Sequence, residues 1–115
     1  MENTGDTPLM IAIKNRKNNY KKIIRYILSF PNEVNIEDKN FEGDTALMLA
    51  VYTGNLKLVK TLIESYNANP NTRENQGFTP FIAACSNWND CKDIIDYFRK
   101  LKKPKVNLHA RSFDG

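Results

Sequence analysis

The chain has 115 residues, of which 41% are hydrophobic and 26% are charged, and its formal net charge is +4. This length suits one small domain, and the hydrophobic content is too high for a disordered chain. Two cysteines and one histidine exclude a disulfide-stapled scaffold and leave almost no ligands for a metal site.

A short motif recurs along the chain. The segment Gly5–Met10 returns as Gly43–Met48 and again as Gly77–Ile82, and Asp114-Gly115 opens a fourth copy. Successive glycines of the motif lie 38, 34 and 38 residues apart, and a second, asparagine-containing marker keeps the same phase. A fixed period of this size predicts a single domain, residues 1–115, built from stacked units. The units span residues of about 5–40, 41–74 and 75–112, and residues 113–115 begin a fourth.

The first half of each unit is predicted to be a short helix. Thr7 and Thr79 stand where an N-cap hydroxyl accepts from a backbone N–H, and Pro8 and Pro80 follow at the first helical position. Apolar residues then recur at i, i+3 and i+4, which predicts one buried stripe. The stripe consists of Leu9, Ala12 and Ile13, then Leu47, Ala50 and Val51, then Phe81, Ala84 and Cys85. We expect Cys85 to be a small buried hydrophobe.

The second half of each unit is predicted to be another helix, reached through a tight turn. In the middle unit this turn contains Gly54, which tolerates positive φ, and the outer units use asparagines in its place. The apolar positions are Ile23, Ile24, Ile27 and Leu28, then Leu56, Val59, Leu62 and Ile63, then Ile94, Ile95, Tyr97 and Phe98. The segments between units are rich in Asn, Asp, Glu and Gly, so they are predicted to project as turns.

This pattern resembles the ankyrin repeat, a turn and two helices in about 33 residues with the signature T-P-L-H-x-A. The middle unit is the most similar, through Gly43, Thr45, Leu47, Ala50, Gly54, Leu62 and Ala68. One departure is uniform, because Met10, Met48 and Ile82 replace the signature histidine, so apolar packing must replace its hydrogen bonds. The resemblance implies an all-α solenoid of stacked helix–turn–helix units with projecting β-turn finger loops.

Both ends of the predicted stack are apolar. The first unit presents Met10, Ile11 and Ile13, and the last presents Tyr97, Phe98 and Leu101, with no polar cap. Because solenoids usually end in polar outer faces, the sequence favours a piece of a longer array over a minimal three-unit stack. Self-association through the uncapped ends is a further expectation.

No motif along the chain predicts catalysis. The phosphate-binding, dinucleotide-binding and nucleophile-elbow patterns are absent, and Cys85 and Cys91 fit no C-x-x-C pair. Asp90 and Asp93 complement the start of a helix, and Asp96 can pair with a lysine four residues away. We therefore expect no enzyme activity, no cofactor and no small-molecule substrate.

The resemblance implies protein–protein recognition, with a partner docked rigidly on the concave surface formed by the turn tips and the first helices. Carried onto this sequence, the partner-binding positions are Lys14, Phe41, Glu42, Asp44, Tyr52, Thr53, Asn75, Gln76, Phe78, Ser86 and Asn87. For Phe41 and Tyr52 the alternative to a binding anchor is a ring that folds back onto a neighbouring turn. The sequence does not identify the partner.

A basic segment offers an alternative function. Residues 14–25 contain no acid, and their cations are Lys14, Arg16, Lys17, Lys21, Lys22 and Arg25. Such a cluster suits a polyanion, either acidic lipid headgroups or RNA, but the sequence favours the alternative, a solvated helix face. Steep weakening with salt distinguishes polyanion binding from protein docking.

From the sequence we expect no signal peptide and no membrane-spanning segment. No apolar run approaches the roughly 20 residues that span a bilayer, and the first residues do not have the pattern of a signal peptide. A cytoplasmic location is expected, and a nuclear location or delivery into a host cell stays open.

Overall fold

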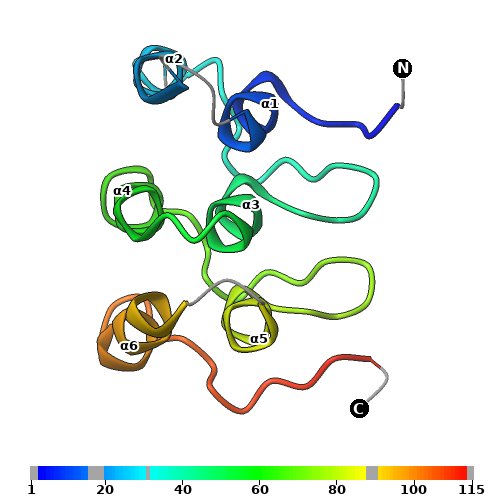
Figure 1. Cartoon of the computed structure of the whole chain (residues 1–115), viewed down its shortest axis with the longest axis vertical. Helices are drawn as coiled ribbons and strands as arrows, with labels where there is room; N and C mark the ends of the chain where they lie inside the picture. Colours follow the sequence, from blue (N-terminus) through cyan, green and yellow to red (C-terminus); the bar gives the residue numbers. More distant parts are fainter. Residues whose placement is uncertain (1–2, 16–19, 31, 88–90, 114–115) are drawn as a thin grey trace.

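The computed structural model describes residues 3–15, 20–30, 32–87 and 91–113 of the chain. Within these ranges the chain forms six helices and no strand (Figure 1). The helices are α1 (Pro8–Lys14), α2 (Tyr20–Leu28), α3 (Ala46–Tyr52), α4 (Leu56–Tyr66), α5 (Pro80–Ser86) and α6 (Lys92–Lys100). The protein is therefore all-α, as the repeat pattern predicts.

The helices stack in two layers. Helices α1, α3 and α5 lie one above another in an inner layer, and α2, α4 and α6 form an outer layer beside it (Figure 1). Each outer helix packs against the inner helix that precedes it, and each inner helix packs against the next inner one. Long loops leave the stack on the side of the inner helices. Contacts between neighbouring units are the arrangement of a solenoid.

Threonine caps begin the three inner helices. The hydroxyl oxygens of Thr7, Thr45 and Thr79 accept from the backbone N–H three residues further on, at 3.2, 3.4 and 3.2 Å. Pro8 and Pro80 occupy the start of α1 and α5. The caps predicted from the sequence are confirmed, and each fixes the point at which a loop becomes a helix. A cap of this kind contributes about 1 kcal/mol.

The centre of the inner layer is the most deeply buried part of the core. Six of the seven residues of α3 are buried, because α1 and α5 cover this helix on two sides and α4 covers it on a third. The predicted stripe is buried in α1 and α3, but the expectation for Cys85 is wrong, since this residue is exposed. Within the described chain α5 has no further inner helix beyond it, so Cys85 faces solvent. The buried cysteine is Cys91, whose Sγ lies 3.7 Å from the carbonyl oxygen of Val51.

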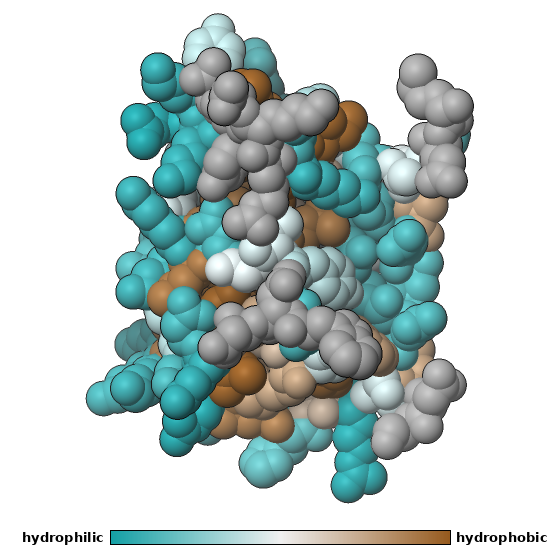
Figure 2. Space-filling model, viewed as in Figure 1, coloured by the Kyte–Doolittle hydropathy of each residue, from teal (hydrophilic) through white to brown (hydrophobic). Residues whose placement is uncertain are grey.

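The ends of the stack are less apolar than predicted. Met10, Ile13 and Phe98 are buried, because α2 and α3 cover the first two and α5 covers the third. Ile11 is exposed, as expected, whereas Ile23 on α2 was predicted to lie in the core and is 46% exposed. Figure 2 shows hydrophobic residues over the level of α5 and α6 and a mostly hydrophilic surface on the side of the projecting loops.

Candidate functional site

Two loops between the units form fingers, each closed by a side chain at its base. In the first finger (residues 40–44), Asn40 Oδ1 accepts from the backbone N–H groups two and four residues further on, at 3.0 and 2.9 Å. In the second finger (residues 74–78), Glu74 Oε1 accepts from the same two positions, at 2.6 and 2.9 Å. An amide and a carboxylate thus close equivalent turns.

Hydrogen bonds join the fingers to one another. The backbone N–H of Asn75 donates to the carbonyl oxygen of Glu42 at 3.0 Å, and the Asn75 side-chain amide donates to the carbonyl oxygen of Phe41 at 2.7 Å. Similar backbone bonds of 2.9 Å tie Phe41 to Thr4 and Phe113 to the second finger. The fingers therefore stand at a fixed spacing and form one continuous wall.

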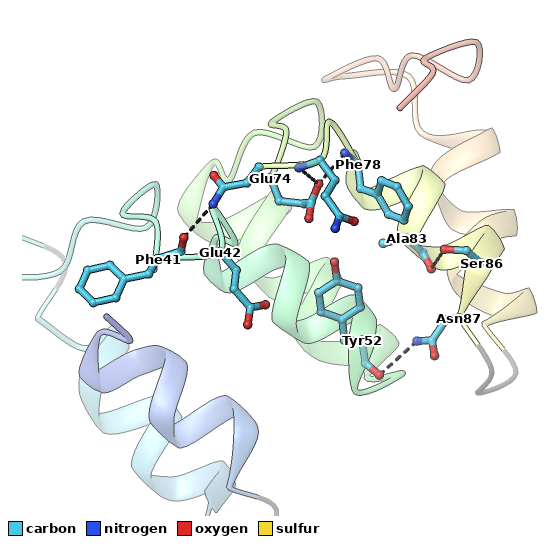
Figure 3. Close-up of a pocket in the computed structure, with 10 residues that line it drawn as sticks. Phe41, Glu42, Tyr52, Glu74, Phe78, Ala83, Ser86 and Asn87 are labelled. Carbon is cyan, nitrogen blue, oxygen red and sulfur yellow. Dashed lines mark hydrogen bonds between the residues drawn. The ribbon is translucent and has the colours of Figure 1, made fainter. Parts of the chain in front are cut away.

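A groove of about 510 Å³ runs between this wall and the inner helices (Figure 3). The residues that line it are Phe41, Glu42, Tyr52, Glu74, Asn75, Gln76, Phe78, Ala83, Ser86 and Asn87. The fingers supply one side, while the end of α3 and the second half of α5 supply the other. The Asn87 amide donates to the carbonyl oxygens of Val51 and Tyr52, both at 3.1 Å, which ties the two inner helices together at the floor of the groove.

Eight of the eleven predicted partner-binding residues line this groove. The other three do not: Lys14 lies on α1, Asp44 is buried at the base of the first finger, and Thr53 caps the end of α3. The Thr53 hydroxyl donates to the carbonyl oxygen of Ala50 at 3.0 Å. For those of the eight whose side chains face into the groove, this position is the geometric condition for binding a partner.

Sequence reasoning missed two lining residues, Glu74 and Ala83. Glu74 could have been found, because it follows Asn40 by 34 residues and both stand three residues before a glycine of the repeated motif. Comparing the units position by position identifies it as the second closing side chain. Ala83 carries no signal of its own, since it is a small residue on a helix whose neighbours decide what it faces.

The Phe41 ring does not point into the groove. It is 65% exposed and covers Gly5, where a Cβ atom would come within 2.5 Å of the ring. Figure 3 shows the ring turned away from Tyr52. Of the two alternatives for this residue, a ring that folds back onto a neighbouring turn describes the structure.

The charges of three carboxylates act on the Tyr52 side chain. Burial, and then the charges of Asp44, Glu74 and Glu42, raise the pKa of Tyr52 above its usual value. Burial, and then the charges of Glu42 and Glu74, raise the pKa of Asp44 to about 6. Tyr52 is hydrogen-bonded to Asp44, while Asp44 Oδ1 has no hydrogen-bond partner in the described part of the chain. The groove therefore gathers acidic side chains in a chain of positive net charge.

Lys14 forms a separate ion pair. Its Nζ lies 2.7 Å from Asp6 Oδ2, and Asp6 Oδ1 accepts from Asn40 Nδ2 at 2.9 Å. Burial acts to raise the pKa of Asp6, but hydrogen bonds from Lys14, Asn40 and Thr4 outweigh burial and lower it. Lys14 thus supports the base of the first finger.

Two cations of the predicted polyanion segment line a second groove. Lys21 and Arg25 of α2 border a groove of about 340 Å³ between α2 and α4, together with Lys57 of α4. No acid is among the described residues that line it, and its apolar lining includes Ile24 and Leu28. Lys22 is exposed on α2 outside this groove, and Arg16 and Lys17 lie outside the described residues.

Other candidate chemistry is not assembled in the described ranges. No three His, Cys, Asp or Glu side chains there are arranged to hold a metal ion, and no helix there is long and apolar enough to cross a bilayer. Asp96 forms an ion pair with Arg99 at 3.0 Å, where the sequence suggested a lysine four residues away. Asp90 lies outside the described residues.

Comparison with known proteins gives one family and several relatives. A family model described as ankyrin repeats, in three copies, matches residues 9–110. Alpha-latrocrustotoxin-Lt1a of Latrodectus tredecimguttatus is 33% identical over 105 residues, which are 91% of this chain and 7% of that protein. Putative ankyrin repeat protein L91 of Acanthamoeba polyphaga mimivirus is 38% identical over 76 residues, which are 60% of this chain and 12% of that protein. The chain spans only a small part of the length of these relatives.

One solved structure shares the fold over nearly the whole chain. It is the crystal structure of the yeast ribosomal protein Rps3 in complex with its chaperone Yar1. The match has a TM-score of 0.75 at 25% identity and covers 92% of this chain and 73% of the matched chain.

Proposed function

The chain belongs to the ankyrin repeat family, and from this membership we propose that it is a protein–protein interaction module whose partner docks in the groove between the fingers and the inner helices. The observation that carries the proposal is the groove itself, which two fingers and two inner helices build jointly. The groove lies between turn tips and first helices, which is where the resemblance implies docking. The matched solved structure is itself a complex of two proteins, which supports a protein as the partner.

The fingers favour docking without rearrangement. Each is closed by a side chain at its base and bonded to its neighbour through the backbone. A surface held in this way loses little conformational entropy when a partner binds, so most of the contact energy is available for affinity. Backbone shifts of no more than about 1 Å are expected between the unbound and bound states.

We propose no catalytic role for this segment. A cytoplasmic location and derivation from a longer repeat protein are further proposals. The second is supported by the relatives, which extend far beyond the matched region.

Replacing Ser86 by arginine tests the docking surface. Ser86 lines the groove, is exposed, and donates its hydroxyl only to carbonyl oxygens of its own helix, so its removal disturbs little. Ser86→Arg fills the groove and should weaken partner binding by at least about tenfold, while the free energy of unfolding changes by less than about 0.5 kcal/mol. Isothermal titration against a partner recovered from source cells measures the affinity, and urea unfolding measures stability.

Ser29→Arg is the matched control. Ser29 is also exposed and also donates its hydroxyl to a carbonyl oxygen of the preceding turn, but it lies at the end of α2, away from the groove. Equal losses of affinity in the two variants, or none in Ser86→Arg, would contradict docking in the groove.

A second candidate function is polyanion binding on the outer layer. The groove between α2 and α4 favours it, because Lys21, Arg25 and Lys57 from two units share one depression whose described lining has no acid. If this groove binds acidic vesicles or RNA, replacing these three residues by glutamine should abolish binding. The affinity of the unmodified chain should then fall steeply with salt, and for single-stranded RNA by about 0.7 log units per neutralised phosphate for each tenfold rise in concentration. Affinity that is insensitive to salt excludes this function.

A further inference from the structure

The groove concentrates acidic side chains. Glu42 and Glu74 line it, and Asp44 lies close enough to both that their charges act on its carboxyl group. Among the described residues that line the groove, none is lysine, arginine or histidine. The whole chain has a net charge of +4, so the acidic character of the groove comes from the local arrangement of its residues and not from the overall composition.

The buried acid at the base of the first finger is only partly satisfied. Asp44 is 3% exposed, and its Oδ1 atom has no hydrogen-bond partner in the described part of the chain. Its hydrogen bond to Tyr52 joins its carboxylate to a side chain that lines the groove. Lys14, the cation whose charge acts on Asp44, is engaged with Asp6 at 2.7 Å. Like charges held together in this way destabilise the unbound protein, and an added cation relieves the repulsion.

The other groups in the groove suit a guanidinium. A carboxylate binds the planar fork of arginine through two parallel hydrogen bonds, and an aromatic face can stack on it. Tyr52 and Phe78 supply rings beside the two glutamates. Glu74 is held in place because its Oε1 accepts from the backbone of Gln76 and Phe78. Its second oxygen, Oε2, is the one that remains for a ligand.

We propose that the groove receives a basic side chain, with arginine preferred over lysine, from an extended segment of the partner protein. This inference rests on the proposed docking function and adds the chemistry of the partner. Glu42 and Glu74 contact the cation, and Asp44, which is hydrogen-bonded to Tyr52, strengthens the local field.

Titration of the isotope-labelled chain with tetra-arginine, followed by amide chemical shifts at about 0.15 M salt, tests the proposal at single-residue resolution. We expect saturable shifts confined to the first finger, the second finger and the end of α3, with dissociation constants of about 1 mM or tighter. Tetra-citrulline, which keeps the shape and removes the charge, should give no saturable shift. Shifts spread evenly over all exposed acids would overturn the proposal.

Two glutamine variants test whether tetra-arginine binds at the acids of the groove. Glu42→Gln removes a charge from the groove and should weaken tetra-arginine binding at least about threefold, which is close to 0.7 kcal/mol. Glu33→Gln removes the charge of an exposed acid outside the groove and should change nothing. Equal effects in the two variants contradict a specific cation site.

The affinity of the partner for the two variants shows whether the basic occupant or the docking surface itself is wrong. If Ser86→Arg weakens the partner but Glu42→Gln does not, the groove is the docking surface and its occupant is not basic. If Ser86→Arg leaves the partner's affinity unchanged, the docking function fails, whatever tetra-arginine does.

Discussion

Asp44 shows how one buried side chain couples the stability of the protein to pH. Its carboxyl group faces the acids Glu42 and Glu74, the cation Lys14 and the hydroxyl of Tyr52. Burial, and then repulsion from the two glutamates, raise its pKa from 3.8 to about 6 in the folded protein. The folded state therefore favours the protonated acid, whose stabilising contribution is complete below about pH 4 and is lost as the pH rises through about 6.

Replacing Asp44 by asparagine should remove this dependence. The amide keeps an acceptor for Tyr52 and carries no charge, so Asp44→Asn should gain stability relative to the unmodified chain between pH 4 and pH 7. The gain should reach at most about 3 kcal/mol, because two pKa units correspond to about that free energy. Urea unfolding of both proteins at pH 4, 5, 6 and 7 measures it. A difference that stays constant over this range, or that shrinks as the pH rises, contradicts the burial of a destabilised carboxylate.

Single residues were predictable from the sequence where one local rule decides them. Thr7 and Thr79 cap their helices, because a cap depends only on the residues within one turn. The exposure of Cys85 and the orientation of the Phe41 ring do not follow from neighbouring residues in the sequence. The exposure of Cys85 depends on whether another unit lies beyond α5, and the orientation of the Phe41 ring depends on the space above Gly5 in the preceding unit.

At the level of elements, two glycines of positive φ serve different turns. Gly54, with φ of 73°, joins α3 to α4, and no atom lies within 4 Å of the place where a Cβ would stand. Gly43, with φ of 84°, lies in the first finger, where a Cβ would come within 2.7 Å of the backbone nitrogen of Asn75. Gly54 is required only for its positive φ. Gly43 is required for its positive φ and for the close contact between the two fingers.

Alanine at these two positions should therefore have unequal effects. Gly54→Ala adds only the strain of a left-handed backbone, about 1–2 kcal/mol. Gly43→Ala adds the same strain and a collision that the backbone of the second finger cannot relieve, so its loss of stability should be larger by more than about 1 kcal/mol. Equilibrium urea unfolding of the two variants compares them. Equal losses contradict a close approach of the fingers.

The sequence predicts where the fingers lie but not which side chains close them. Glycine, asparagine and acidic residues between the apolar stripes indicated projecting turns, and both fingers lie there. Asn40 and Glu74 close equivalent turns, although the glutamate side chain is longer than the asparagine side chain. The residue types alone do not indicate that both reach the same backbone N–H groups. The groove followed from the resemblance, whereas its acidic character required the positions of Glu74 and Asp44.

At the scale of the whole molecule, the stack has a centre and two ends. Helix α3 contacts α1, α4 and α5, whereas α1 contacts only α2 and α3 extensively in the described chain. Stability in such a stack is shared between neighbours. Removing contacts at the centre should therefore affect every unit, and removing them at one end should affect that end first.

Met10 and Met48 offer a matched pair for this test, because they occupy equivalent positions and are 1% and 0% exposed. Each change to alanine should destabilise its surroundings by about 2–5 kcal/mol. In Met10→Ala, hydrogen exchange should accelerate in α1 and α2 while α5 and α6 keep their protection, whereas Met48→Ala should accelerate exchange in all six helices. Identical exchange patterns in both variants contradict a stack stabilised by neighbours.

The end faces bear on the oligomeric state. Ile11 and Ile23 are exposed at the first unit, and Cys85 is exposed at the last, so self-association through the ends stays a prediction. Light scattering across a range of concentrations decides between a 13.3 kDa monomer and a reversible assembly.

Site-specific photo-crosslinking can show whether a protein partner docks in the groove between the fingers and the inner helices. A photoreactive residue at Gln76 places the probe in the groove, and the same residue at Lys57 places it on the outer layer. We predict a covalent adduct with the partner from position 76 and none from position 57, with the attachment site beside an arginine or lysine of the partner. An adduct from position 57 alone would contradict it.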